Sequence, residues 1–190
     1  MARLKLNQLI IWNDYVPLNA EDIVNYAHEY NIKVIWGFAW GWSRNCMDGE
    51  VNALNELAAT IIENYKNNYK NLLGDGIYFQ SFTEVNVDKI GDKLIAEAVV
   101  DLVNMVSNEI YKISPDLLIQ FGLHATSVKD KLRFIDKVDK RVEIIWENCG
   151  AFPYWGDPLE VSDEDFAKTI NFNRDIMALR DNGKIGMLFK

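Results

Sequence analysis

The segment from Leu6 to Pro17, LNQLIIWNDYVP, decides between the two architectures that the rest of the sequence allows. Its first part, Leu6–Trp12, is a short apolar run of the kind that forms a buried strand. A doubly wound nucleotide-binding sheet carries a glycine-rich turn directly after its first strand. Here the turn from Trp12 to Pro17 contains no glycine. The sequence therefore favours a (β/α) barrel over a doubly wound sheet.

Outward from this segment, short apolar runs alternate with stretches whose apolar residues recur at helical spacing. The first expected helix has Asn19 as its N-cap, and the last opens at Ser162–Asp165, which resembles a capping box. Such alternation predicts a parallel sheet with right-handed crossovers, and near-continuous apolar strands suit a sheet buried on both faces. The expected strands are Leu6–Trp12, Lys33–Phe38, Gly76–Phe82, Leu117–Leu123, Val142–Trp146 and Lys184–Phe189.

The length of 190 residues predicts one domain, residues 1–190, with a single buried core. A complete eight-stranded barrel needs about 200 residues or more. We therefore expect an incomplete TIM-type (β/α) barrel of about six βα units. The exposed parallel edges of such a sheet predict self-association.

Composition excludes several classes of partner. The formal net charge of −8 argues against binding to nucleic acid or to an anionic membrane surface. The sequence shows no signal peptide and no apolar run long enough to cross a membrane. We expect a soluble protein whose location the sequence leaves open. Cys46 and Cys149 are expected to be free thiols, because two cysteines make no disulfide framework.

All six tryptophans lie at or just after the C-terminal ends of expected strands. Ligands bind at this end of (β/α) barrels, and flat aromatic faces suit the C–H faces of sugar rings. Packing in the core is the alternative for Trp12, Trp36 and Trp146. For Trp40, Trp42 and Trp155, which lie farther into the loops, we predict substrate binding or packing of a lid.

Polar residues follow the same strand ends, and we predict that they bind substrate with the tryptophans. They are Asn13, Asp14, Arg44, Gln80, Asn86, His124 and Asn148. The two histidines, His28 and His124, form no metal-binding spacing. No phosphate-binding loop and no nucleophile elbow is present either. The expected ligand is a carbohydrate, and we expect neither a metal nor another cofactor.

Two carboxylates, Glu84 and Glu147, end the third and fifth strands. Strands two places apart put their backbones roughly 10 Å apart. Inward-leaning side chains then reach glycosidase separations, about 5–5.5 Å for retention or roughly 6.5–9.5 Å for inversion. We predict that Glu84 is the general acid and Glu147 the nucleophile or base. The alternative is that either glutamate pairs with a lysine or arginine of a loop.

Three segments resemble the barrel domain of family-20 hexosaminidases and their relatives: Arg3–Trp12 (RLKLNQLIIW), Ile32–Trp36 (IKVIW) and Asp75–Glu84 (DGIYFQSFTE). The resemblance implies that they are the second, third and fourth strands of that barrel, the last ending in the catalytic acid Glu84. That family places an aspartate directly before the acid, to orient the acetamido group of the substrate. Here the residue is Thr83, which puts acetamido-assisted catalysis in doubt and favours Glu147 as the second carboxylate or a different sugar.

Two other functions remain open. One is a carbohydrate-binding barrel without catalysis. The other is an isomerase or lyase on the same fold, for which Lys190 after the sixth strand is the candidate. Glycoside hydrolysis is the first hypothesis, because it uses both the tryptophans and the paired carboxylates.

Overall fold

The structure of the chain, a computed structural model, describes residues 1–12, 15–38, 51–80, 89–90, 92–124, 132–147, 174–180 and 185–188. For residues 51–53, 80, 90, 124, 132, 146, 147, 187 and 188 it describes the backbone alone.

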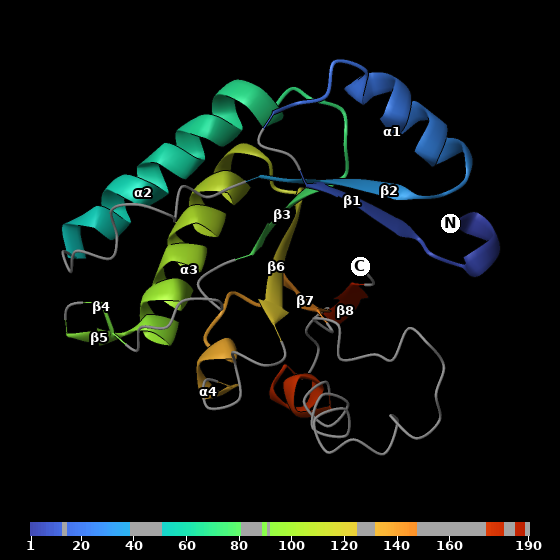
Figure 1. The fold of residues 1–190 in the computed structure, drawn as a ribbon. Coiled ribbons are helices and arrows are strands. Elements are labelled where there is room, and N and C mark those ends of the chain that lie inside the picture. Colours follow the sequence, from blue (N-terminus) through green and yellow to red (C-terminus); the bar gives the residue numbers. More distant parts are fainter. Residues whose placement is uncertain are drawn as a thin grey trace.

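A six-stranded parallel sheet forms the centre of the described fold (Figure 1). Its strands, in the order in which they pair, are β1 (Gln8–Trp12), β2 (Lys33–Gly37), β3 (Gly76–Gln80), β6 (Leu118–His124), β7 (Glu143–Glu147) and β8 (Ile185–Leu188). The helices are η1 (Ala2–Leu4), α1 (Ala20–Glu29), α2 (Val51–Asn64) with its π-helical extension η3 (Tyr65–Tyr69), α3 (Ile95–Ile113) and α4 (Leu132–Ile135). Residues 174–179 are helical, and β4 (Lys89–Ile90) pairs with β5 (Lys93–Leu94) in a small hairpin.

The predicted strands are confirmed, each within two residues of its expected ends. Asn19 does occupy the N-cap position of α1, but its side chain makes no capping hydrogen bond, so that part of the prediction is wrong. Neither the β4–β5 hairpin nor the π-helical turn was predicted. None of the described helices is long and apolar enough to span a membrane.

The sheet is buried on both faces. On the outer face, α2 and α3 lie side by side and cover the central strands (Figure 1). Val34, Ile77 and Ile119 belong to the large core on this side. On the inner face, Ile35 and Tyr78 pack with Ile145 in a second, smaller core. Burial on both faces explains why the strands read as nearly continuous apolar runs.

A pair of hydrogen bonds across the inner face shows that the sheet curves strongly. The side-chain amides of Gln8 on β1 and Gln120 on β6 donate to each other at 3.1 and 2.9 Å. These strands are three places apart, about 14 Å in a flat sheet, and side chains stand roughly perpendicular to a sheet. The two amides meet only because the sheet bends toward its inner side.

The register agrees with this curvature. From Gln120, the paired positions run through Tyr78 and Gly37 to Trp12, which is four residues beyond Gln8 on β1. The contact between Gln8 and Gln120 is therefore staggered by about one residue for each step between strands. An eight-stranded barrel with a shear of 8 has this stagger. The sheet thus follows the wall of a (β/α) barrel.

Candidate functional site

The ring of Trp12 stands at the C-terminal end of β1, where ligands of (β/α) barrels bind. Its residue is 49% exposed. A Cβ atom built on Gly37, its partner on β2, would lie 2.6 Å from Cε3 of this ring. Glycine at this position therefore lets the indole lie against bare backbone.

Tyr78 on β3, two strands away from β1, packs against Trp12. The two rings meet edge to face, with centroids 5.8 Å apart and planes at 78°. Tyr78 itself is buried, and a Cβ atom on Gly122 would lie only 1.9 Å from its hydroxyl oxygen. Two glycines of the sheet thus make room for two aromatic rings on the inner face. Tyr78 was not predicted as a site residue, although alternation along β3 gives it the same face as the position of Gln80.

A polar layer lies deeper on the inner face. The amide of Gln120 donates to Oε2 of Glu143 at 2.7 Å as well as to Gln8. Because an ionised carboxylate only accepts hydrogen bonds, the contact with Glu143 fixes the orientation of the amide of Gln120, and through it that of Gln8. Gln120 is fully buried. The signal for this layer was Gln120, a polar residue in the middle of the otherwise apolar run Leu118–Leu123.

At the C-terminal ends of β6 and β7, the backbone positions of two predicted site residues lie side by side. His124 ends β6 and Glu147 ends β7, and their Cα positions are paired. Gln80 ends β3 and is paired with Gly122. Alternation gives these three positions the same face as Tyr78, Gln120 and Glu143.

For Trp36 the structure favours packing in the core over substrate binding. It was predicted to bind substrate, but it is only 3% exposed and belongs to the core beneath the helices. Its indole Nε1 donates to the carbonyl of Leu73 at 2.8 Å, next to Gly74, where any Cβ atom would collide with the ring. Trp36 follows the inward-facing Ile35 and so faces the opposite side of the sheet. Its role is to pack β2 against the segment that leads into β3.

The other predicted site residues lie outside the described part of the chain or are described by their backbone alone. For Gln80, His124, Trp146 and Glu147 the backbone position is known. Outside the described residues lie Asn13, Asp14, Trp40, Trp42, Arg44, Glu84, Asn86, Asn148, Trp155 and Lys190, as do both cysteines. Within the described ranges, no three histidine, cysteine or acidic residues gather in a way that could hold a metal ion.

The clearest electrostatic shifts lie around the turn before β7. Burial, aided by the charge of Asp139, raises the pKa of Tyr111 to about 12. Arg141 forms a two-pronged ion pair with Asp139, lowering the pKa of that carboxyl, and its guanidinium stacks on the ring of Tyr111 at 4.3 Å. Asp139 and Arg141 lie in the turn just before β7, and Tyr111 lies near the C-terminal end of α3. The cluster therefore links α3 to that turn, at the opposite end of the strands from Trp12.

No known protein family matches the chain, and no curated protein matches it either. Solved structures do match. The catalytic domain 2 of the Group II chitinase of Ostrinia furnacalis is similar with a TM-score of 0.56 and 13% identity, over 95% of this chain and 55% of that one. The C-terminal domain of Legionella pneumophila ChiA gives a TM-score of 0.50 and 10% identity, over 77% and 52%. A GH18 chitinase from Pseudoalteromonas aurantia gives 0.48 and 15%, over 82% and 56%.

These similarities establish the fold as an incomplete α/β barrel, as the sequence predicted. The chain spans about half the length of each of these three structures. None of the three is described as a family-20 enzyme, so the resemblance to that family stays a prediction.

Proposed function

We propose that this chain binds a carbohydrate at the C-terminal ends of its strands and cleaves a glycosidic bond there. The observation that carries the proposal is the half-exposed ring of Trp12, held at the mouth of a barrel-like sheet. Trp12 combines packing against Tyr78 with an exposed surface at the end of the barrel where ligands bind, and this combination favours a binding role.

The support beneath Trp12 matters for binding. The indole rests on the backbone at Gly37 and against the edge of Tyr78, so its orientation is fixed before a ligand arrives. A ring that is already ordered loses little conformational entropy on binding. Its free face suits the C–H face of a pyranose, with polar groups at neighbouring strand ends for the hydroxyl groups.

For catalysis the proposal assigns Glu84 and Glu147. Glu147 ends β7, and Glu84 follows the last residue of β3 by four positions in the sequence. Because β6 lies between β3 and β7, the two strands are two places apart, the spacing assumed for the pair. Glu84 would protonate the glycosidic oxygen as the sugar leaves, while Glu147 attacks the anomeric carbon or activates water.

The first ligand to test is a chitooligosaccharide, because one of the similar structures is a chitinase domain with a TM-score above 0.5. Calorimetric titration would measure its affinity, and reducing-end release would measure turnover. Trp12→Ala should weaken binding about tenfold, which corresponds to about 1.4 kcal/mol of lost stacking. Glu84→Gln should abolish turnover and leave the affinity nearly unchanged.

Tyr26→Ala is the matched control, since Tyr26 is 65% exposed on α1, away from the strand ends. It should change neither quantity. Binding without turnover in the unmodified chain would favour the non-catalytic, carbohydrate-binding alternative. Failure of a broad panel of glycans to bind, or binding unaffected by Trp12→Ala, would contradict the proposal.

A further inference from the structure

The hydroxyl of Tyr78 leans toward the end of the sheet where Trp12 stands. Tyr78 lies on β3 and is paired in register with Gln120 on β6. Its hydroxyl oxygen lies instead over Gly122, where a built Cβ atom would come within 1.9 Å of it. Gly122 is the next inward position of β6 toward the C-terminal end. The side chain therefore reaches one inward step along the sheet, two residues or about 6.6 Å.

A glycine in the middle of β6 makes this reach possible. Glycine weakens the interior of a strand, because it has no side chain to pack and loses more entropy on folding. At Gly122 the hydroxyl and the far end of the Tyr78 ring take the place of the missing side chain. Tyr78 is only 1% exposed. Its hydroxyl is therefore enclosed inside the fold and acts on a bound ligand only through another side chain.

The polar layer on the other side of Tyr78 makes hydrogen bonds within itself. Both amide protons of Gln120 are used, one toward Gln8 at 2.9 Å and one toward Glu143 at 2.7 Å. The side-chain oxygen of Gln120 in turn accepts a hydrogen bond from Gln8. These contacts hold the Gln120 amide in its own layer, whereas the hydroxyl of Tyr78 lies one inward step closer to the ligand end, over Gly122.

The next inward positions toward the ligand end belong to predicted site residues. On β7 the residue paired with Gly122 is Ile145, whose side chain offers no hydrogen bond. One inward step farther lie His124 on β6 and Glu147 on β7, which are paired with each other. Strand spacing and rise put the Cα atoms of Gly122 and Glu147 about 8 Å apart, within reach of a glutamate that leans back. An ionised carboxylate is the acceptor that suits a tyrosine hydroxyl as donor.

We propose that Tyr78 is a positioning residue, whose hydroxyl donates a hydrogen bond to the carboxylate of Glu147. This inference rests on the proposed function, in which Glu147 is the nucleophile or base. A hydrogen bond to an ionised acceptor is roughly twice as strong as a neutral one, so it fixes the direction of the carboxylate. It also favours the ionised form, which is the form that attacks the anomeric carbon or activates water.

Two other titratable residues of the described strands lie near Glu147 on the inner face. His124 occupies the paired position on β6, and Glu143 lies two inward steps earlier on β7 itself. On the other side, β8 places Leu188 at the paired position, and none of the residues of β8 titrates. A protonated His124 favours the ionised carboxylate, and the charge of Glu143 disfavours it. Tyr78→Phe leaves both residues in place, so this substitution isolates the proposed hydrogen bond.

The test is an NMR titration of the Glu147 carboxyl group in the whole chain, with isotope-labelled glutamate and with Glu147→Gln to assign the signal. Tyr78→Phe removes only the hydroxyl, so the pKa of Glu147 should rise by about one unit, a tenfold change in proton affinity. Tyr65→Phe is the matched control, because Tyr65 is also buried and donates its hydroxyl to Ser114, in the core under the helices. An unchanged pKa in a folded Tyr78→Phe protein, or equal shifts in both variants, would overturn the inference.

Turnover of the chitooligosaccharide separates a failure of this inference from a failure of the proposed function. In an active chain, Tyr78→Phe should lower kcat about tenfold and move the acid side of the pH profile to higher pH, because more of Glu147 is then protonated at a given pH. Tyr65→Phe should change neither. A rise in the pKa of Glu147 without turnover of any glycan would support the hydrogen bond and contradict the proposed function alone. An active chain whose pH profile is the same with Tyr78→Phe would overturn this inference alone.

Discussion

The middle of the sheet and its β1 edge are made of similar residues and differ in what covers them. On β6, Ile119, Phe121 and Leu123 are at most 3% exposed. On β1, Leu9 and Ile11 belong to an equally apolar run and face the same core, but they are only partly buried. β6 has a strand on each side and shares its core with residues of α3, whereas β1 has one described strand partner.

The difference shows that burial here comes from neighbours and only indirectly from hydrophobicity. The middle of the sheet supplies most of the apolar burial that stabilises the fold. The edge carries the ring of Trp12, which is proposed to bind a ligand. Three sets of substitutions test how sharply the two regions differ.

The largest effect is expected for a pair of truncations on the outer face of the sheet. Ile119→Ala in β6 removes a fully buried side chain and should cost about 4 kcal/mol of unfolding free energy. Ile11→Ala in β1 removes a side chain that is only partly buried and should cost about 1.5 kcal/mol. Urea denaturation measures both values. Equal losses would mean that the β1 edge is as well covered as the middle.

Arg180 tests how the start of β7 is anchored. Its guanidinium is buried and donates to the carbonyls of Val138 and Val142 at 2.9 and 2.8 Å, and to that of Asp139 at 3.1 Å. Burial lowers its pKa. Arg180→Ala strands these buried carbonyls without donors and should cost about 3 kcal/mol in the same denaturation experiment.

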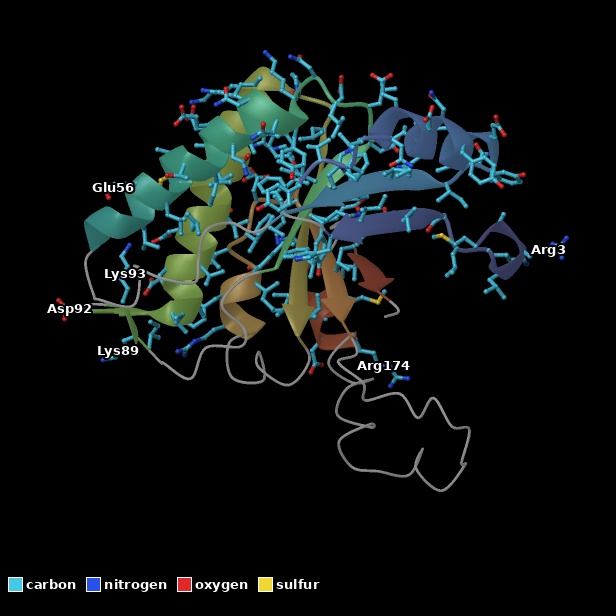
Figure 2. All side chains as sticks on the ribbon, turned by 45° about the horizontal axis from the view of Figure 1, so that its top comes forward. Arg3, Glu56, Lys89, Asp92, Lys93 and Arg174 are labelled. Carbon is cyan, nitrogen blue, oxygen red and sulfur yellow. The ribbon has the colours of Figure 1, made fainter. Side chains whose placement is uncertain are left out.

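Arg174 is the control for this prediction. It is exposed on the same helical segment and points away from the sheet (Figure 2). Arg174→Ala should change the unfolding free energy by less than about 0.5 kcal/mol. A loss for Arg180→Ala as small as this one would show that the buried guanidinium contributes little to anchoring β7.

The smallest effect concerns the glycines of the inner face. Gly122→Ala would place Cβ 1.9 Å from the hydroxyl of the buried Tyr78, so the ring must move, at a cost of about 2 kcal/mol. Adding Tyr78→Phe should recover part of the loss. Gly186→Ala, on β8, would meet only the terminal methyl of Ile145 and should cost less than about 1 kcal/mol, by the same overpacking argument. Thermal unfolding would rank the three, and a larger loss at Gly186 would contradict the comparison.

Much of the fold was predictable because it depends on local patterns. Apolar runs separated by helical stretches gave six strands, and helical connections force neighbouring strands to run parallel. The polar residue in the middle of β6, Gln120, was visible in the sequence, but its partner Gln8 was not. Their contact depends on curvature and stagger, which no single segment contains.

The candidate site was predictable to a lesser degree. The sequence by itself determined that Trp12 and Glu147 end strands. Only the tertiary structure decided that Trp12 lies at the open mouth while Trp36 is buried under the helices. The paired position of Trp12 on β2 is Gly37, one residue beyond Trp36. Because side chains alternate between faces, that one-residue difference sends the two rings to opposite sides of the sheet.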